Sequence, residues 1–294
     1  MPSLQALRTR IGTVKSTRKI TTAMKLVAAG KLRRAQEQAV AAQPYAAAMS
    51  RMLARVSQGS TGQSGMPPLL IGTGKSEVQL LVVMSADRGL CGGFNGHALR
   101  EARRQIDAVR RAGQQFKLIT VGKKIHESLR REYKNQIVYQ MAEFSKPRLE
   151  FSAAEELAQQ ILELFERGEF DVCKLVFNKF VNILVQKPSL RQLIPFQVPE
   201  TQSVNDNEGG GMYEFEPSAE EILSALLPRN LAMQIYSAML DNAAGEQAAR
   251  MTAMDNATRN AGDMIHKLTL NYNRARQAAI TTELIEIISG AEAV

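Results

Sequence analysis

The last quarter of the chain reads as one helix that is too long for any compact domain. Between Arg229 and Ile288 there is no proline, and only Gly245 and Gly262 interrupt a sequence rich in alanine and methionine. At ~1.5 Å per residue such a helix spans ~90 Å, whereas a globular domain of ~100 residues has a radius of gyration of only ~13 Å. This helix must therefore extend beyond its domain and bury its apolar stripe against another helix.

A second long helix is predicted over residues 3–57, with Ser3 as its N-cap. Apolar residues follow one another at alternating intervals of three and four, the seam of a two-stranded coiled coil. This seam contains Leu4, Leu7, Ile11 and Val14 and, after an interruption between Thr17 and Ala28, Leu32, Ala35, Ala39, Ala42, Ala46, Met49, Leu53 and Val56. The last helix carries a comparable stripe through Leu240, Ala243, Gln247, Arg250, Met254, Ala257, Ala261, Met264, Leu268, Ala275 and Ala278. Because both helices flank the middle of the chain, their pairing must be antiparallel.

The middle of the chain alternates strands with helices. Strands are expected at 78–84, 116–121, 136–141, 171–180 and 191–196, with a further edge strand at 213–215. Helices are expected at 95–112, 123–132 and 152–167, the last with Ser152 as its N-cap and Glu155 completing a capping box. Such alternation predicts a mostly parallel α/β sheet. The fold class is thus a Rossmann-like α/β domain (77–200) inserted between the coiled-coil helices at 1–58 and 218–294.

Two glycine-containing stretches raise the possibility of nucleotide binding. Gly74-Lys75-Ser76 resembles the end of a P-loop, but Leu69 stands where the motif needs glycine, and the strand follows the loop instead of preceding it. The turn after the first strand holds Gly89, Gly92 and Gly93, at the edge where α/β sheets bind ligands. Its spacing does not match GxGxxG. We favour a tight turn that allows close chain packing, and a nucleotide-binding enzyme is the alternative.

Composition narrows the remaining functional classes. Cys91 and Cys173 lie outside any CxxC spacing, which argues against a disulfide scaffold, and three scattered histidines give no metal-ligand cluster. No apolar stretch is long enough to span a membrane. Residues 1–58 hold eleven Lys and Arg residues and a single acidic residue. With a pI near 9.6, this basic helix makes a nucleic-acid-binding coiled coil the rival interpretation, although few aromatic residues are interleaved.

Three stretches give the chain a close resemblance, over its whole length, to the gamma subunit of F-type, proton-translocating ATP synthases. They are 16–29 (STRKITTAMKLVAA), 87–93 (DRGLCGG) and 280–291 (ITTELIEIISGA), and EQAARM at 246–251 is also typical. The resemblance implies a non-catalytic central rotor shaft that couples proton flow through the membrane c-ring to ATP synthesis or hydrolysis at catalytic beta subunits. It implies no cofactor on this chain, because the alpha and beta subunits bind nucleotide and magnesium.

The resemblance also implies partners and contact residues. The partners would be the alpha/beta hexamer, the epsilon subunit and the c-ring, with an inhibitor protein as a further candidate; neither nucleic acid binding nor direct membrane insertion is expected. Rotor–stator contacts would involve Met24, Lys25, Arg276, Gln277, Ile280, Thr281, Glu283 and Glu286, and a bearing tip would contain Ile287, Ile288, Gly290 and Ala291. From the residues alone, Met24 is equally well read as a seam residue.

The same resemblance suggests where the protein works. Gamma subunits are peripheral proteins, so we expect this chain at the cytoplasmic face of a bacterial inner membrane as part of the complex. The heptads run from Leu4 with no cleavage-like boundary, which favours this location over the mitochondrial inner membrane. The inserted cysteine pair of chloroplast gamma subunits is missing, so we expect no thiol switch of that kind.

Overall fold

The computed structural model describes residues 3–59, 67–144, 148–196 and 219–292. It divides into two compact units, Met1–Gly30 with Arg250–Val294 and Lys31–Ala249, called here the helix-pair unit and the sheet unit. Two helices belong to both units: α1 covers Leu4–Gly59 and α6 covers Ala219–Glu292. At ~1.5 Å per residue they are ~80 Å and ~110 Å long. The expected edge strand at 213–215 and the acidic, glycine-rich loop before it lie outside the described residues.

The sheet unit contains one mixed sheet of five strands in the order β3-β2-β1-β4-β5. The strands β1 (Val78–Met84), β2 (Gln115–Val121), β3 (Ile137–Met141) and β4 (Val172–Phe180) are parallel, and β5 (Gln186–Ile194) pairs antiparallel with β4. In β1 every residue after Val78 is buried, as expected for a strand covered on both faces. The predicted fold class, a Rossmann-like domain between two long helices, is confirmed.

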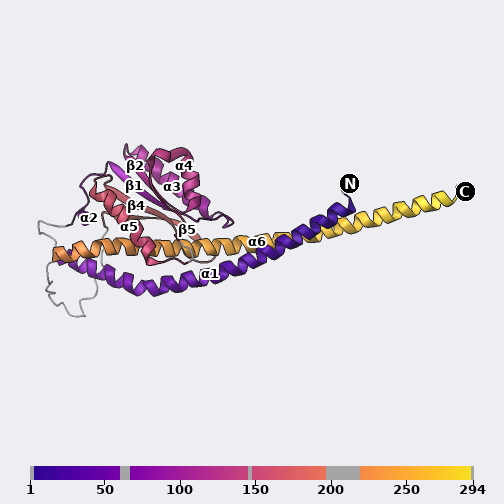
Figure 1. Ribbon diagram of the computed structural model, residues 1–294, viewed down its shortest axis with the longest axis horizontal. Helices are drawn as coiled ribbons and strands as arrows, with labels where there is room; N and C mark the ends of the chain where they lie inside the picture. Colours follow the sequence, from indigo (N-terminus) through magenta and orange to yellow (C-terminus); the bar gives the residue numbers. More distant parts are fainter. Residues whose placement is uncertain (1–2, 60–66, 145–147, 197–218, 293–294) are drawn as a thin grey trace. The chain divides into compact units, whose positions relative to one another are not determined.

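Helices cover both faces of this sheet (Figure 1). On one face, α3 (Phe94–Arg111) and α4 (Lys123–Tyr133) bury Ile106 and Leu129 against Leu81 of β1. On the other, α5 (Phe151–Glu166) and the first part of α6 bury Leu157 and Ile235 against Leu80. The short helix α2 (Pro68–Ile71) and a 3-10 turn, η1 (Lys134–Gln136), complete the unit. Neither short element was predicted, because three or four residues carry no periodicity.

Tertiary packing moved several element boundaries from their expected places. The helix α5 starts at Phe151 with Glu150 as its N-cap and no capping side-chain hydrogen bond, so the predicted Ser152 cap is wrong. Here Leu149 is buried and the Phe151 ring packs edge-on against Tyr236 of α6, with centroids 5.4 Å apart. These contacts place the helix start one residue early. Strand β5 likewise starts at Gln186 instead of 191, because it forms a hairpin with β4.

In the sheet unit the two long helices also pack on each other. Met49, Leu53 and Val56 of α1 form a buried cluster with Leu223 and Leu227 of α6. This cluster explains why α6 already begins at Ala219, nine residues before Pro228. Similarly, α1 continues through Pro44.

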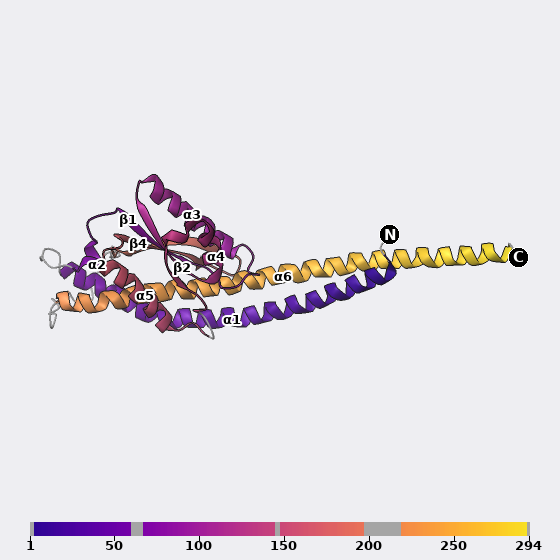
Figure 2. The ribbon, with the colours of Figure 1, turned by 45° about the horizontal axis from the view of Figure 1, so that its top comes forward.

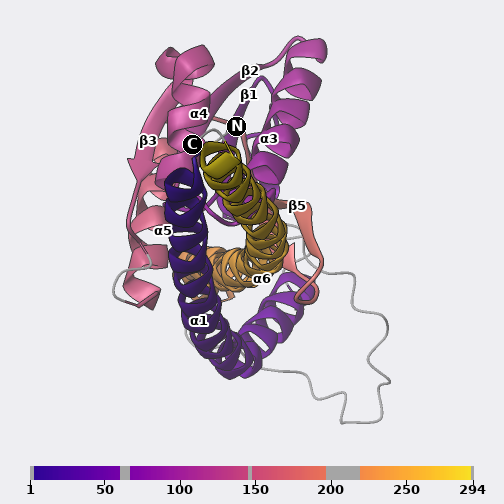
Figure 3. The same ribbon diagram turned by 90° about the vertical axis from the view of Figure 1, so that its right-hand side faces the viewer.

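In the helix-pair unit α1 and α6 lie side by side and antiparallel, as predicted (Figures 1 and 3). The predicted interruption of the first seam is wrong: counting from Val14 in steps of seven reaches Thr21 and Ala28, which are 8% and 1% exposed. The heptad repeat thus continues through this stretch, with a polar residue, Thr21, at one of its seam positions. On α6 the seam passes through Ile265, whereas Met264 is 46% exposed. From Met254 onward a row of buried or half-buried positions follows steps of four and three, through 254, 258, 261, 265, 268, 272, 275 and 279, and the adjoining positions 255, 257 and 262 are half-buried as well.

Candidate functional site

A polar layer crosses the seam of the helix-pair unit. The hydroxyls of Thr21 and Thr258 lie 2.7 Å apart, and the Lys25 ammonium donates to Asp255 over 2.7 Å. Arg259, one turn along α6, lies 3.3 Å from the other carboxylate oxygen of Asp255. Polar residues at seam positions specify register, since any slip would leave them facing apolar side chains. We therefore interpret this layer as the feature that aligns α1 with α6.

The ion pair in this layer depends on pH. The hydrogen bond from Lys25 lowers the pKa of Asp255 below its ordinary value, with the charges of Lys25 and Arg259 acting in the same direction. A carboxylate with a depressed pKa stabilises the folded state above its unfolded pKa, and this contribution is lost as pH falls through the folded pKa. The pairing is thus fully present at neutral pH and weakens only in the acid range.

Reversing one charge in the layer should loosen the helix pair. In Lys25→Glu a carboxylate faces Asp255, so we expect a lower melting temperature for the helical circular dichroism signal. The double variant Lys25→Glu with Asp255→Lys should recover most of the loss, because it restores opposite charges. Lys19→Glu is the matched control, since Lys19 is exposed on the same helix. A double variant that melts no higher than Lys25→Glu would contradict the pairing.

The C-terminal part of α6 is exposed throughout. The contact residues that the resemblance implied there, Arg276, Gln277, Ile280, Thr281, Glu283 and Glu286, are all exposed, as are Ile287, Ile288, Gly290 and Ala291 of the implied tip. Figure 2 shows this segment of α6 continuing past the N-terminal end of α1. Ile287 is 68% and Ile288 58% exposed. Clustered exposed apolar side chains mark an interaction surface.

The two predicted contact residues on α1 have different surroundings. Met24 lies beside the seam and is half-buried. This agrees with the interpretation of Met24 as a packing residue, and part of its side chain remains accessible. Lys25, in contrast, forms an ion pair with Asp255. Asp255 and Thr258 were missed from the sequence. A strict heptad count through Val14, Thr21 and Ala28 would have placed polar residues in the α1 seam and called for polar partners on α6.

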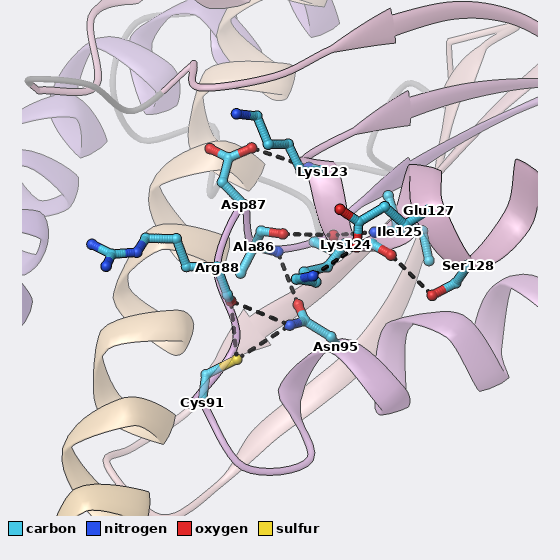
Figure 4. A network of polar contacts seen from close by, with 11 residues as sticks. Ala86, Asp87, Arg88, Cys91, Asn95, Lys123, Lys124, Ile125, Glu127 and Ser128 are labelled. Atoms are coloured by element: carbon cyan, nitrogen blue, oxygen red, sulfur yellow. Dashed lines mark hydrogen bonds and ion pairs between the residues drawn. The ribbon is translucent and has the colours of Figure 1, made fainter.

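The glycine-rich turn after β1 is held by its own backbone and by α3 and α4 (Figure 4). Asn95 accepts a hydrogen bond from the Ala86 amide at 3.0 Å and directs its own amide toward the Arg88 carbonyl and the Cys91 sulfur. Asp87 accepts from the Lys123 amide at 3.0 Å. The turn is therefore a packing structure, in line with the favoured interpretation of its sequence.

The crevice beside this turn is filled by the chain itself. In doubly wound sheets ligands bind where the strand order reverses, here between the carboxyl ends of β1 and β4. At that place the Asn242 amide of α6 donates to the Ser85 carbonyl, and Asn178 of β4 donates to the Phe94 carbonyl, each over 3.2 Å. Gly245 of α6 allows this approach: a Cβ there would lie 3.1 Å from the Phe94 ring. Residues of α6 thus pack directly against the turn at this edge of the sheet.

The second glycine-containing stretch also lacks the features of a phosphate site. Thr73 donates its hydroxyl to Asp171 at 2.7 Å, and the amides of Glu77 and Val78 donate to the same carboxylate. The loop around exposed Lys75 is therefore organised around an anion supplied by the protein. Within the stretch that resembles a P-loop, the Lys75 amide donates to the Thr73 hydroxyl at 3.3 Å.

Other chemistry is sparse in the described part of the chain. Both cysteines are buried and neither forms a disulfide, and burial raises the pKa of the Cys173 thiol, so it is a poor nucleophile. Within residues 3–59, 67–144, 148–196 and 219–292, no three histidine, cysteine or acidic residues gather as metal ligands. Nor does any described helix combine the length and apolarity of a membrane span.

A Rossmann-like sheet inserted between two long helices that pair antiparallel defines a class of coiled-coil protein with an α/β domain. A family model described as ATP synthase matches residues 3–294. The ATP synthase gamma chain of Rhodospirillum rubrum is 52% identical and that of Gluconacetobacter diazotrophicus 54% identical, each over 100% of both chains. The chain therefore belongs to the ATP synthase gamma chain family.

Solved structures share the fold. A chain of the Euglena gracilis mitochondrial ATP synthase superposes with a TM-score of 0.67 at 20% identity, over 99% of this chain and 94% of that one. A central-stalk and c-ring structure from Tetrahymena thermophila gives 0.60 at 24% identity, over 81% and 99%. As a gamma chain the protein is a non-catalytic subunit of the ATP synthase complex, and its full-length relatives named here are bacterial.

Proposed function

We propose that this chain is the central rotor shaft of an F-type ATP synthase and couples proton flow through the c-ring to ATP synthesis or hydrolysis at the beta subunits. The exposed C-terminal segment of α6 carries this proposal most directly. It presents apolar side chains, with Ile287 68% exposed, on a single helix beyond the seam, as a bearing inside a ring of subunits would require. Nucleotide and magnesium would be bound by the alpha and beta partners.

The helix-pair unit has the mechanical properties that such a shaft needs. Torque transmission requires that two helices do not slide past one another, and the polar layer at Thr21 and Lys25 opposes sliding because its partners match in one register only. Small seam residues, such as Ala28 and Ala261, let the backbones approach closely. The basic face of α1 would guide acidic segments of the surrounding subunits into place.

The partners and the location follow from this role. The alpha/beta hexamer would surround the C-terminal segment, while the epsilon subunit and the c-ring would bind elsewhere on the chain; an inhibitor protein is a further candidate. The complex would hold the chain peripherally at the cytoplasmic face of a bacterial inner membrane.

A charge reversal in the exposed segment tests the coupling role. In Arg276→Glu complexes we expect ATP-driven proton pumping per ATP hydrolysed to fall about fivefold, because a surface charge contact is worth up to ~1 kcal/mol. ATP hydrolysis and proton uptake should be measured together in vesicles. Arg274→Glu, also exposed on α6, serves as the control. Unchanged pumping and ATP synthesis in Arg276→Glu would argue against this contact.

The rival nucleic-acid function rests on the basic first helix. It predicts salt-dependent duplex binding by the isolated chain at nanomolar concentration, without affinity for an alpha–beta ring. We expect the opposite result, with binding to the ring and no duplex binding above the level of a general basic protein. Filter binding and co-purification with alpha and beta subunits distinguish the two.

A further inference from the structure

The tip of the β4–β5 hairpin exposes an unusual cluster of apolar side chains. Val181, Ile183, Leu184 and Val185 are 54%, 44%, 78% and 48% exposed. Apart from Asn182, the whole tip is apolar. Hairpin tips are normally polar, because nothing in the fold covers them. Large clustered apolar side chains at such a place mark a surface that another chain covers. We call residues 181–185 the hairpin knob.

The knob is rigid. The Asn182 side-chain oxygen accepts hydrogen bonds from the amides of Leu184 and Val185, at 2.9 and 2.8 Å. The Val185 carbonyl accepts from the amides of Val181 and Asn182, both at 3.2 Å. A structured tip loses little conformational entropy when it binds, so more of the contact energy appears as affinity. The apolar side chains are thus held outward by a built turn.

The base of the hairpin is tied to the rest of the sheet unit. The buried amide of Asn178 donates to the Phe94 carbonyl at 3.2 Å. A Cβ at Gly245 of α6 would lie 3.3 Å from the Gln186 side chain and 3.1 Å from Phe94. A partner held by the knob would therefore be held in a defined position relative to this part of α6.

Two lysines give the surface a positive charge. Lys179 and Lys187 are directly paired across the antiparallel ladder, so their side chains leave the same face, and both are exposed. Like charges in this position destabilise a hairpin. Neither takes part in an ion pair among the described residues. The half-buried carboxylate of Asp241 interacts electrostatically with Lys179 and also with Arg191. One carboxylate thus faces two cations, and the surface keeps a surplus of positive charge.

We propose that the hairpin knob and the Lys179–Lys187 pair form the docking surface for an acidic, partly apolar segment of a subunit that turns together with this chain. Carboxylates on that segment relieve the lysine repulsion, and its apolar residues cover the knob. A contact that combines apolar burial with paired charges resists separation. Such a contact with a stationary subunit would oppose every turn, whereas with a co-rotating subunit it never has to break. This inference rests on the proposed rotor function.

Photo-crosslinking in the intact, ATP-hydrolysing complex tests the proposal. With p-benzoylphenylalanine at position 184, we expect one main crosslink, to an acidic peptide of a subunit outside the alpha–beta ring, and ATP hydrolysis should persist after irradiation. The matched control carries the crosslinker at Val138, which is 39% exposed on β3, and should not give this product. Absence of a crosslink, or a crosslink to alpha or beta that arrests turnover, would overturn the proposal.

Charge reversal at the two lysines provides a second test of the proposal. Lys179→Glu combined with Lys187→Glu should lower the crosslink yield at least about fivefold, because two surface charge contacts are lost. The double variant Lys75→Glu with Lys134→Glu changes the same total charge at exposed sites and should leave the yield unchanged. Equal yields in both double variants would refute the charge argument.

The two proposals can fail separately. A wild-type chain that does not co-purify with alpha and beta subunits would overturn the rotor function and this inference with it. Co-purification without a crosslink at position 184 would overturn this inference alone.

Discussion

We expect Ala261→Pro to disrupt the helix-pair unit at a cost of about 3 kcal/mol or more. Proline removes the amide that donates to the carbonyl of residue 257, and its ring collides with that carbonyl. Ala261 is also a seam residue, only 7% exposed, so a bend there separates α6 from α1. Thermal unfolding followed by circular dichroism, together with hydrogen exchange in residues 250–279, measures the effect.

The end of the same helix provides the control. Ala291→Pro and deletion of residues 290–294 should each be tolerated better than Ala261→Pro, because Gly290 and Ala291 are exposed and the last turn supports little further structure. Assembly with alpha and beta subunits is the functional readout. If Ala261→Pro and the deletion reduced assembly equally, the seam would not be the element that holds the unit together.

Gly122→Ala should destabilise the sheet unit by about 3 kcal/mol, from backbone strain and overpacking together. The φ angle of Gly122 is +103°, and a Cβ would lie 2.7 Å from the Ser85 carbonyl oxygen. That carbonyl accepts the hydrogen bond from Asn242. A displaced Ser85 therefore loosens α6 in the crevice between β1 and β4. Chemical unfolding monitored by circular dichroism gives the change in free energy of unfolding.

Gly113→Ala separates the two causes. Its φ angle is +72°, but no heavy atom lies within 4 Å of the Cβ position. Only the backbone cost remains, about 1 kcal/mol. If Gly113→Ala and Gly122→Ala were equally destabilising, close packing against Ser85 would contribute nothing, and the seating of α6 would have to depend on other contacts.

Much of the architecture follows from local patterns. The run of apolar residues in 78–84 predicts a strand covered on both faces, and its bounds match β1. The seam of α1 is predicted through Val56, and Leu32 and Leu53 are indeed buried. Ser3 caps α1 as expected, with its hydroxyl accepting from the Ala6 amide at 3.2 Å. These features depend on neighbours in sequence, so a short window of residues contains them.

The errors have a common cause. Thr17 to Ala28 looked like an interruption because Thr21 is polar, and only its partner Thr258, far away in sequence, makes it a seam residue. Met264 and Ile265 are both apolar, and the supercoil path of α6 against α1 decides which of them faces inward. The sequence predicts the start of β5 too late, because the hairpin that joins β5 to β4 turns on apolar residues, which give no turn signal.

Local sequence patterns are enough to predict that two helices longer than any compact domain must pair and that an α/β sheet lies between them in the chain, and the motifs point to the ATP synthase gamma chain family. Periodicity and motif are enough for this, because both are properties of residues close together in the chain. The folded chain adds that Lys25 pairs with Asp255, that Asn242 and Gly245 of α6 pack at the crevice, and that the hairpin knob is exposed. Each of these depends on which distant side chains meet, and charge and apolarity alone leave many partners possible.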